Sequence, residues 1–437
     1  MPKKITAVNV VNAINNQINK VYKTNLPAVD EKSFANMAEQ LQTAPDVIRN
    51  AWQDALVNLV GLQMVKNKRN YEGYFKNLYK APTATENIQL IMADLLETKT
   101  FSPDADADDF FADEKADIET QYVTSMVKTV IPLSVNEETL MAAFITVGAF
   151  DEYLGNLVSR MYDTMENFDV QATKAMLEKN IEDGNFYLIP MAKPVDKDTS
   201  LAWTADIKRV AEDMRVEMDN LYNLSHLHTW TPADDGVIVG TTSTVSIAET
   251  YSLAFAFNES YIDLKKKGQF VTLPSSGLCN GAVFGGYFDR DMLEIRDKIG
   301  FPRVTSQYFG NTLTMKRWLH NQKLMAVSYF NNAVFYVDPD SVGIKSAELA
   351  TRDGSLNVNR GGNKKVYVKS VTAGENKLAD KFGTFSIAGA NSAKTYIDAN
   401  SGKLIVGKDE TADNITVTWT SHLNPGITAQ ATITVNG

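Results

Sequence analysis

The sequence contains a single cysteine, Cys279, and only four histidines among its 437 residues. One cysteine excludes an internal disulfide and any metal cluster that is held by several thiolates. Basic residues are also in deficit, because 43 lysines and arginines face 53 aspartates and glutamates and the net charge is −10. A protein that holds nucleic acid tightly through its phosphates normally has the opposite sign, so the charge argues against non-specific DNA binding.

Long apolar runs are absent as well. The longest apolar stretch, residues 140–150, is too short to span a bilayer, and residues 1–20 lack the unbroken apolar run of a signal peptide. We therefore expect a soluble protein, made in a reducing cytoplasm, that makes no contact with a membrane. Hydrophobic residues make up 44% of the chain, which is enough to fill a core and excludes a disordered protein. The length predicts two or three domains.

The first 132 residues show weak periodicity. Residues 1–40 are polar and rich in asparagine, and they predict an arm with short helical pieces. A firmer helix is predicted from about residue 43, where Thr43 can cap it and Pro45 suits the first turn. Residues 66–132 turn basic and aromatic and then place eight acidic residues within 104–119. They predict an extended excursion with limited secondary structure.

The strongest helix signal lies at residues 134–183. Ser134 and Glu137 have the spacing of a capping box, and Gly184 stands just past the end, where a left-handed cap is favoured. Between them runs an apolar stripe with steps of three and four residues, formed by Phe150, Leu154, Leu157, Val158, Met161, Met165 and Phe168. This pattern predicts one long helix that forms a spine.

The remainder of the chain divides into two parts of different character. Residues 236–337 mix short strand and helix signals, and 324–337 predicts one or two buried strands. Residues 356–437 show threonine-rich alternation with regularly spaced turns, which is typical of a small β-sandwich. A domain boundary is predicted near 340–355.

One acidic motif suggests metal binding only at first sight. Asp104, Asp106 and Asp108 have the spacing that opens a calcium-binding loop. However, Asp109 occupies the position that needs glycine, and Lys115 occupies the position that needs glutamate. The pattern therefore favours a solvated acidic loop over a calcium site.

Other candidate sites also fail. His226 and His228, near Asp234 and Asp235, have no third imidazole or thiol close by in the sequence, so packing or loop hydrogen bonding is favoured over a metal. The glycines of 277–287 match neither phosphate-binding pattern, and Cys279 has no adjacent histidine. We expect no catalytic residues, no metal and no cofactor, and hence no enzyme.

Three stretches carry a resemblance to a known family. Residues 131–163, 239–258 and 316–337 resemble the major capsid protein of tailed bacteriophages, whose fold is named after phage Hong Kong 97. The similarity is closest to the small short-tailed phages of the Picovirinae type. Residues 396–407, with the threonine-rich strands that follow, resemble the bacterial immunoglobulin-like domain of group 2.

The resemblance implies an α+β chain with a Hong Kong 97-type capsid fold and a C-terminal all-β immunoglobulin-like sandwich. The capsid fold would occupy residues 1–345. It would comprise an N-arm and first helix (1–64), an extended loop (65–132), a peripheral domain with the spine helix (133–198), a mainly axial domain (199–320) and return strands (321–345). The immunoglobulin-like domain would occupy residues 356–437.

The resemblance also implies a structural function. Many copies, arranged as hexamers and pentamers, would close an icosahedral or prolate head around double-stranded DNA, without sequence-specific DNA binding. The implied partners are a separate scaffold protein and a portal (connector) protein. The virion would assemble in the host bacterial cytoplasm. The C-terminal domain would reinforce the shell or bind cell-surface glycans weakly. The alternatives are a bacterial surface adhesin or phage tail-fibre protein and, with least support, an enzyme.

Candidate assembly residues follow from the same resemblance. The acidic excursion would lie over a neighbouring subunit and meet basic side chains there, and one face of the spine helix would pack on a sheet. The candidates are Asp104, Asp106, Asp108 and Asp109 in the excursion, Phe150, Leu154, Met161 and Met165 on the helix, and Lys265, Lys266 and Lys267 as basic partners.

Overall fold

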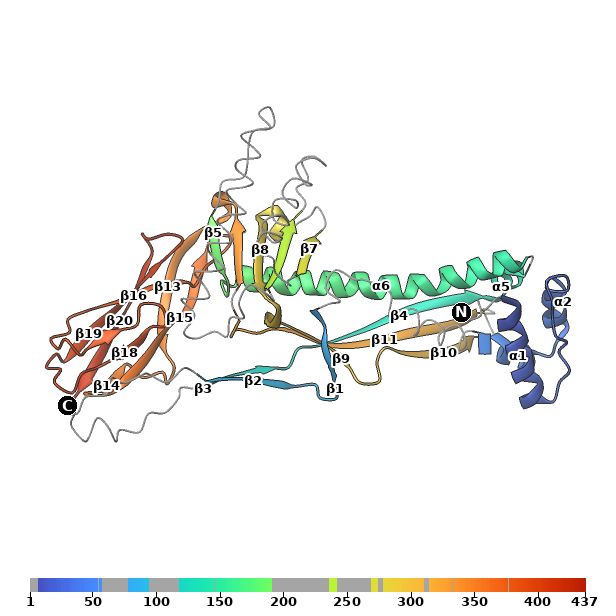
Figure 1. The fold of residues 1–437 in the computed structure, drawn as a ribbon, viewed down its shortest axis with the longest axis horizontal. Helices are drawn as coiled ribbons and strands as arrows, with labels where there is room; N and C mark the ends of the chain where they lie inside the picture. Colours follow the sequence, from blue (N-terminus) through green and yellow to red (C-terminus); the bar gives the residue numbers. More distant parts are fainter. Residues whose placement is uncertain are drawn as a thin grey trace, which may run out of the picture. The chain divides into compact units, whose positions relative to one another are not determined.

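The computed structural model describes residues 7–53, 55–56, 78–93, 118–144, 146–190, 236–241, 269–273, 278–309, 314–331, 333–375 and 377–437 (Figure 1). The chain is a mixed α+β protein with more strands than helices. It divides into two compact units. Unit 1 comprises residues 1–86, 125–172 and 295–325, and unit 2 comprises residues 87–124, 173–294 and 326–437.

A five-stranded sheet forms the centre of unit 1. Its strands are β1 (Lys80–Thr83), β9 (Leu293–Lys298), β11 (Thr314–Val327) and β10 (Arg303–Phe309), in that order, and β4 (Met126–Asn136) also pairs with β11. The antiparallel register of β4 and β11 is unbroken from Met126 opposite Leu324 to Asn136 opposite Thr314. Because this partner is remote in sequence, the prediction of limited structure through residue 132 is wrong for β4.

The predicted spine is present as a shorter helix that follows a strand. The long helix is α6 (Val147–Glu182), with α5 (Glu137–Ala143) before it, and Gly184 has a φ of 73° just past its end, as predicted. The predicted capping box is wrong, because Ser134 lies in β4 and pairs with Lys316. Strand pairing over the whole of β4 outweighs the local capping preference of that serine.

One side of α6 packs on the sheet of unit 1. Met161 and Met165 are buried against Leu319 of β11, with Ile131 and Leu133 of β4 nearby. In unit 1 the buried positions continue at four-residue steps to Asp169, which is 4% exposed. Phe168 is 40% exposed, so the predicted apolar stripe is wrong at this residue. The neighbouring Asp169, which is polar, is buried in its place.

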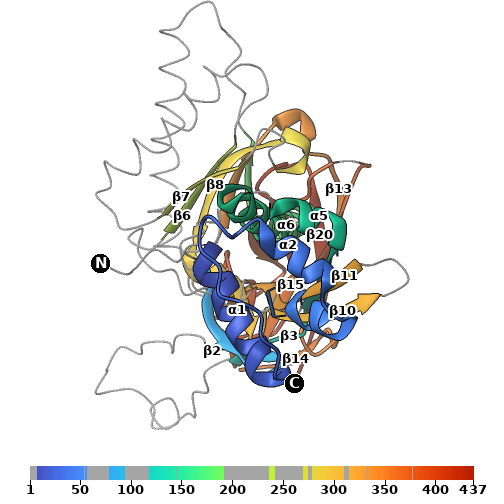
Figure 2. The same cartoon turned by 90° about the vertical axis from the view of Figure 1, so that its right-hand side faces the viewer.

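Helix α1 (Ala7–Tyr22), drawn in blue in Figure 2, contributes to another hydrophobic core of unit 1. Its apolar face packs on α2 (Asn36–Thr43) and α5, with Trp52 and Phe144 fully buried between them. Residues 46–53 are helical, but Thr43 does not cap them. Its hydroxyl instead donates to the carbonyls of Glu39 and Gln40 at the end of α2, so the predicted cap is wrong.

Three asparagines of α1 hold the extended segment that follows the helix. The side-chain amide of Asn12 donates to the Val29 carbonyl and accepts from the Val29 N–H. The side-chain amide of Asn19 makes the same two hydrogen bonds with the backbone of Leu26. Asn15 donates to the Pro27 carbonyl and accepts from Trp52 Nε1 at 2.9 Å. These side chains satisfy backbone groups that have no strand partner, which explains why asparagine interrupts the apolar pattern.

In unit 2, a second five-stranded sheet has the order β5 (Tyr187–Pro190), β12 (Ala333–Val337), β8 (Val283–Asp289), β6 (Gly236–Thr241) and β7 (Gln269–Leu273). All five residues of β12 are buried, as residues 324–337 predict. Gly286 is required in β8, because a Cβ there would come within 2.5 Å of the Phe335 ring. Short 3-10 turns lie at Cys279–Gly281, Arg290–Met292 and Pro339–Ser341.

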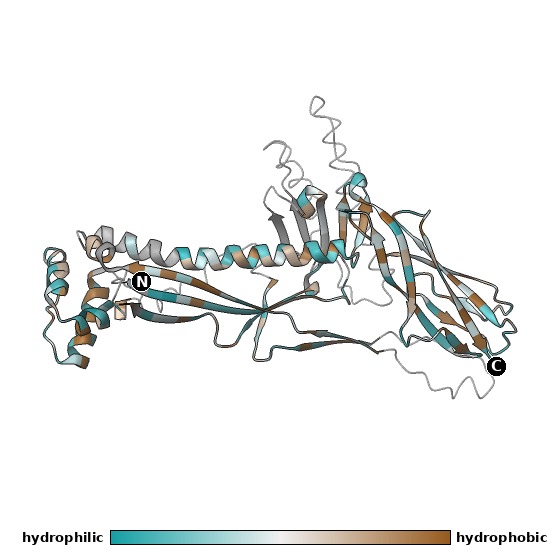
Figure 3. Ribbon diagram, turned by 180° about the vertical axis from the view of Figure 1, so that it is seen from behind, coloured by the Kyte–Doolittle hydropathy of each residue, from teal (hydrophilic) through white to brown (hydrophobic). Residues whose placement is uncertain are grey.

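Two four-stranded sheets share one core at the C-terminal end of unit 2. One has the order β13 (Ile344–Thr351), β15 (Asn363–Ala373), β18 (Lys403–Ile405) and β17 (Tyr396–Ile397). The other has the order β14 (Asn357–Asn359), β20 (Thr428–Asn436), β19 (Asn414–Ser421) and β16 (Gly383–Ala388). Alternate residues of β19 are buried, and the alternation is visible as colour along the strands (Figure 3). We call residues 344–437 the C-terminal sandwich.

A charged side chain is buried in the centre of unit 1. Lys323 of β11 is about 3% exposed, and its Nζ lies 2.6 Å from Asp169 Oδ2 and 3.4 Å from Asp297 Oδ1. It also lies 4.3 Å from the centre of the Tyr79 ring. Burial opposes the charge, but Tyr79 and the two carboxylates outweigh burial and raise the pKa of Lys323 above its usual value. Lys323 therefore stays charged, and its contacts with Asp169 and Asp297 join β11 to α6 and β9.

We predict that Lys323→Met destabilises the chain by about 3–5 kcal/mol, because it leaves Asp169 as an uncompensated buried charge. Urea unfolding measures this change. The matched control is Lys128→Met, which removes an ion pair to Glu86 whose lysine side chain is 55% exposed, and should cost less than about 1 kcal/mol. If the two variants lost equal free energy of unfolding, the buried Lys323–Asp169 ion pair would not have the proposed importance for stability.

Candidate functional site

The structure describes only some of the residues that the sequence selects. The acidic candidates Asp104, Asp106, Asp108 and Asp109, the basic candidates Lys265, Lys266 and Lys267, and the pair His226 and His228 lie outside the described residues. Phe150 and Leu154 belong to α6. Met161 and Met165 face the sheet of unit 1. A role for any of these residues in assembly stays a prediction.

The described residues offer little for catalysis. None of their histidines, cysteines, aspartates and glutamates form a group of three or more that could hold a metal ion. None of their helices is long and apolar enough to cross a membrane. Burial raises the pKa of the Cys279 thiol to about 12, and nearby Glu178 and Glu182 act in the same direction, so this thiol is a poor nucleophile.

A two-stranded hairpin presents an apolar face. Strands β2 (Ile88–Ala93) and β3 (Ile118–Val123) pair with each other and, among the described strands, with no third one. The register places Ile91, Ile118 and Tyr122 on the same face, and these side chains are 63%, 53% and 69% exposed. Large apolar side chains gathered on one exposed face are typical of a surface that binds a partner.

Strand β3 of the hairpin is held within unit 2 by polar contacts. Gln121 donates to the Val327 carbonyl at 2.8 Å and accepts from the Tyr329 N–H at 3.0 Å. The Lys365 ammonium lies 3.0 Å from the Glu119 carboxylate, and Arg352 donates to the Ile118 carbonyl at 2.6 Å. An isolated hairpin is at best marginally stable in water, so these contacts fix its position.

A histidine joins the C-terminal sandwich to β5. His422 Nδ1 lies 2.8 Å from Asp380 Oδ2 and 3.0 Å from the Phe382 carbonyl, and Nε2 lies 2.9 Å from the Leu188 carbonyl. Both ring nitrogens thus face acceptors, an arrangement that requires two N–H donors and therefore an imidazolium. Burial opposes this charge, but Asp380 and the two carbonyls raise the pKa of His422 to about 9.

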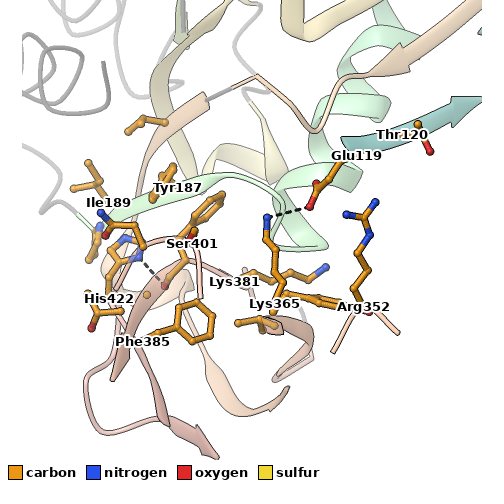
Figure 4. A pocket seen from close by; sticks show the side chains of 18 residues that line it. Glu119, Thr120, Tyr187, Ile189, Arg352, Lys365, Lys381, Phe385, Ser401 and His422 are labelled. Carbon is orange, nitrogen blue, oxygen red and sulfur yellow. Dashed lines mark hydrogen bonds and ion pairs between the residues drawn. The ribbon is translucent and has the colours of Figure 1, made fainter. Parts of the chain in front are cut away.

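A pocket of about 880 Å³ lies within unit 2, lined by β5, the start of β3 and the C-terminal sandwich. One wall is aromatic, because Tyr187 stacks on Phe382 with ring centroids 3.5 Å apart and Phe385 lies close by. The opposite wall carries Arg352 and Lys365 (Figure 4). The pocket can therefore accept a ligand that is both acidic and apolar.

Sequence reasoning missed the hairpin face, the histidine contact and the pocket. A signal for the hairpin was present, because residues 118–123 alternate in the manner of a strand. No local signal could have found the histidine contact, because His422 and Leu188 are far apart in the chain and meet only through the fold.

We predict that the C-terminal sandwich is held less firmly at alkaline pH. Because the pKa of His422 is higher in the folded chain, its stabilisation is complete below about pH 6.5 and is lost as pH rises through about 9. Asp380 acts in the same direction at lower pH, since burial raises its pKa to about 6. His422 is 33% exposed, so we expect a loss of only ~1–2 kcal/mol.

Urea unfolding of the full chain and of His422→Gln measures this effect. The wild type should be the more stable of the two at about pH 6.5, and the difference should nearly vanish at about pH 9.5. His320→Gln in unit 1 serves as the control for the loss of a histidine. A difference that stays constant with pH would show that His422 acts only by packing.

Two relatives of this chain are phage major capsid proteins. The chain is 23% identical over 336 residues to the major capsid protein of Bacillus phage GA-1, covering 75% of this chain and 69% of that protein. It is 21% identical over 194 residues to the major capsid protein of Bacillus phage B103, covering 44% and 42%. A capsid structure of Staphylococcus phage Andhra aligns with a TM-score of 0.44 and 12% identity, over 60% of this chain and 84% of that one.

Residues 11–337 match the Phi29-like phage major capsid protein family, so the match includes most of the described residues outside the C-terminal sandwich. A major capsid protein is a structural component of the virion that associates with copies of itself, and it is not an enzyme. The absence of a catalytic pattern in the sequence is consistent with this function. The chain belongs to the family of Phi29-like phage major capsid proteins.

Proposed function

We propose that this chain forms the phage head through a Hong Kong 97-type capsid fold that ends before β13. The C-terminal sandwich, residues 344–437, forms an immunoglobulin-like domain that includes β13 in addition to the expected residues 356–437. The long helix α6 packed on the sheet of unit 1 supports the first part of the proposal. Two four-stranded sheets around a shared core support the second. Hexamers and pentamers of the chain would close the shell around double-stranded DNA in the host bacterial cytoplasm, with a separate scaffold protein and a portal protein.

The exposed apolar face of the hairpin is the observation that supports a specific contact between subunits. Ile91, Ile118 and Tyr122 are each more than half exposed, although each is large and apolar. Covering such side chains stabilises an interface by about 1.5–3 kcal/mol per fully buried residue. In a closed shell the same contact recurs in every copy, so a small gain per subunit is multiplied. This face therefore lies on a neighbouring subunit.

We predict that Ile91→Asp lowers the yield of shells by at least about tenfold, because it places a charge in every copy of an apolar contact. Shells are counted by negative-stain microscopy after co-expression with the scaffold protein. The matched control is Ile299→Asp in unit 1, where the isoleucine is 62% exposed against 63% for Ile91. If both variants assemble equally well, the hairpin face is not an interface.

The C-terminal sandwich is proposed to reinforce the shell. It is fastened to β5 by His422 and by the stacked pair Tyr187 and Phe382. A domain held this firmly to β5 can stiffen the subunit that carries it, which a loosely tethered binding module cannot. Weak binding to cell-surface glycans is the competing role.

We predict that a chain ending at Gly343 forms fewer or less stable shells than the full chain. The deletion begins there because β13 belongs to the sandwich through its pairing with β15. Particle yield and resistance to heating, followed by light scattering, give the result. Intact particles of normal stability that adsorb less to host cells would favour glycan binding instead.

A further inference from the structure

The pocket in unit 2 has a chemistry that none of the functions above uses. The side chains of Arg352, Lys365 and Lys381 line it as cations, and so does the His422 imidazolium that is paired with Asp380, against a single carboxylate, that of Glu119. Tyr187, Phe382 and Phe385 add an aromatic wall. A guanidinium has five N–H donors and an ammonium has three, so each of these groups can bind a carboxylate in addition to the contact it already makes. Such a lining suits an acidic peptide that also carries aromatic side chains.

The sequence contains one such peptide shortly before the pocket-lining residues Glu119 and Thr120. Residues 104–117, DADADDFFADEKAD, hold seven carboxylates, one lysine and two adjacent phenylalanines, Phe110 and Phe111. This acidic segment lies outside the described residues. The chain leaves it at Ile118, whose carbonyl is bound by Arg352, and the next residue, Glu119, is bound by Lys365. Two pocket cations thus already hold the residues that directly follow the segment.

We propose that the pocket is the docking site for residues 104–117 of the same chain. Two observations identify the segment as the ligand. Its negative charge complements the cations of the pocket, and it is covalently attached to Ile118 and Glu119, which those cations bind. A segment that is covalently attached at the rim of a site has a high effective concentration there, so weak individual contacts suffice. The carboxylates bind Arg352 and Lys381, and a phenylalanine packs on the aromatic wall beside Phe385.

The size of the pocket limits how much of the segment enters it. A volume of about 880 Å³ is in the range that accepts a drug-sized ligand. The pocket therefore holds a few residues around Phe110 and Phe111, and the flanking aspartates stay at its rim. Burial lowers the pKa of Lys381, and a docked carboxylate would favour the charged form of this ammonium.

The proposal goes beyond shell formation, because it concerns the unassembled subunit. It is tested by zero-length carbodiimide cross-linking of carboxylates to lysines in the full chain at low concentration. Mass spectrometry should find cross-links from residues 104–117 to Lys365 and Lys381. Lys369, which is 56% exposed on β15 and outside the pocket lining, is the internal control and should give at least about fivefold fewer.

Isotope labelling identifies the chain that supplies the segment. In a mixture of ¹⁴N and ¹⁵N protein, docking within one chain gives cross-linked pairs of one isotope only. Pairs that mix the isotopes would assign the segment to a second copy and overturn the proposal. Cross-links distributed among lysines simply by their exposure would overturn it as well.

A pair of variants checks that the pocket cations bind the segment. Arg352→Gln with Lys381→Gln should reduce the cross-links to Lys365 at least about fivefold, since attraction to the carboxylates is lost. Lys369→Gln with Lys408→Gln removes the same charge elsewhere on the C-terminal sandwich and should change nothing. An unchanged urea-unfolding midpoint confirms that both variants are folded. Equal cross-linking in the two variants would contradict the proposal.

Discussion

A buried ammonium in the centre of unit 1 constrains three elements at once. Lys323 extends from β11 to Asp169 of α6 and Asp297 of β9, and its side chain is only about 3% exposed. A charge at this depth is tolerated only when its partners are held at hydrogen-bond distance. The rotation of α6 and the register of β11 are therefore fixed together, and the same rotation presents Met161 and Met165 to the sheet. Polar and apolar contacts here enforce one arrangement.

Polar side chains perform a similar task at other places in the molecule. Asn12 and Asn19 bind backbone groups of an extended segment that has no strand beside it. Asp380 and His422 connect the C-terminal sandwich to β5 across a long separation in sequence. In each case a buried or half-buried polar group has a specific partner, so a wrong arrangement would leave it unsatisfied. A shell protein benefits from such specificity, because many copies of the chain must share one fold.

In the hairpin of β2 and β3, polar contacts fix one face and leave the other face exposed. Its inner side is fixed by Gln121 and Glu119, and both contacts are polar. The opposite face carries Ile91, Ile118 and Tyr122, which no described residue buries. A hairpin that is anchored on one face and apolar on the other gains stability when a second chain covers it. This asymmetry links the local structure to membership in a family of shell-forming proteins.

The sequence by itself determined the long helix, the alternating strands of residues 356–437 and the absence of a catalytic pattern, because each depends on the order of nearby residues. It also carried the resemblance to a capsid protein. The predicted helix caps at Ser134 and Thr43 were wrong. Ser134 pairs within a sheet, and Thr43 binds the end of the preceding helix α2. Only the tertiary structure decided that β4 pairs with β11, that Lys323 is buried and that Lys365 meets Glu119. These contacts join residues far apart in the chain, and local periodicity carries no information about such pairs.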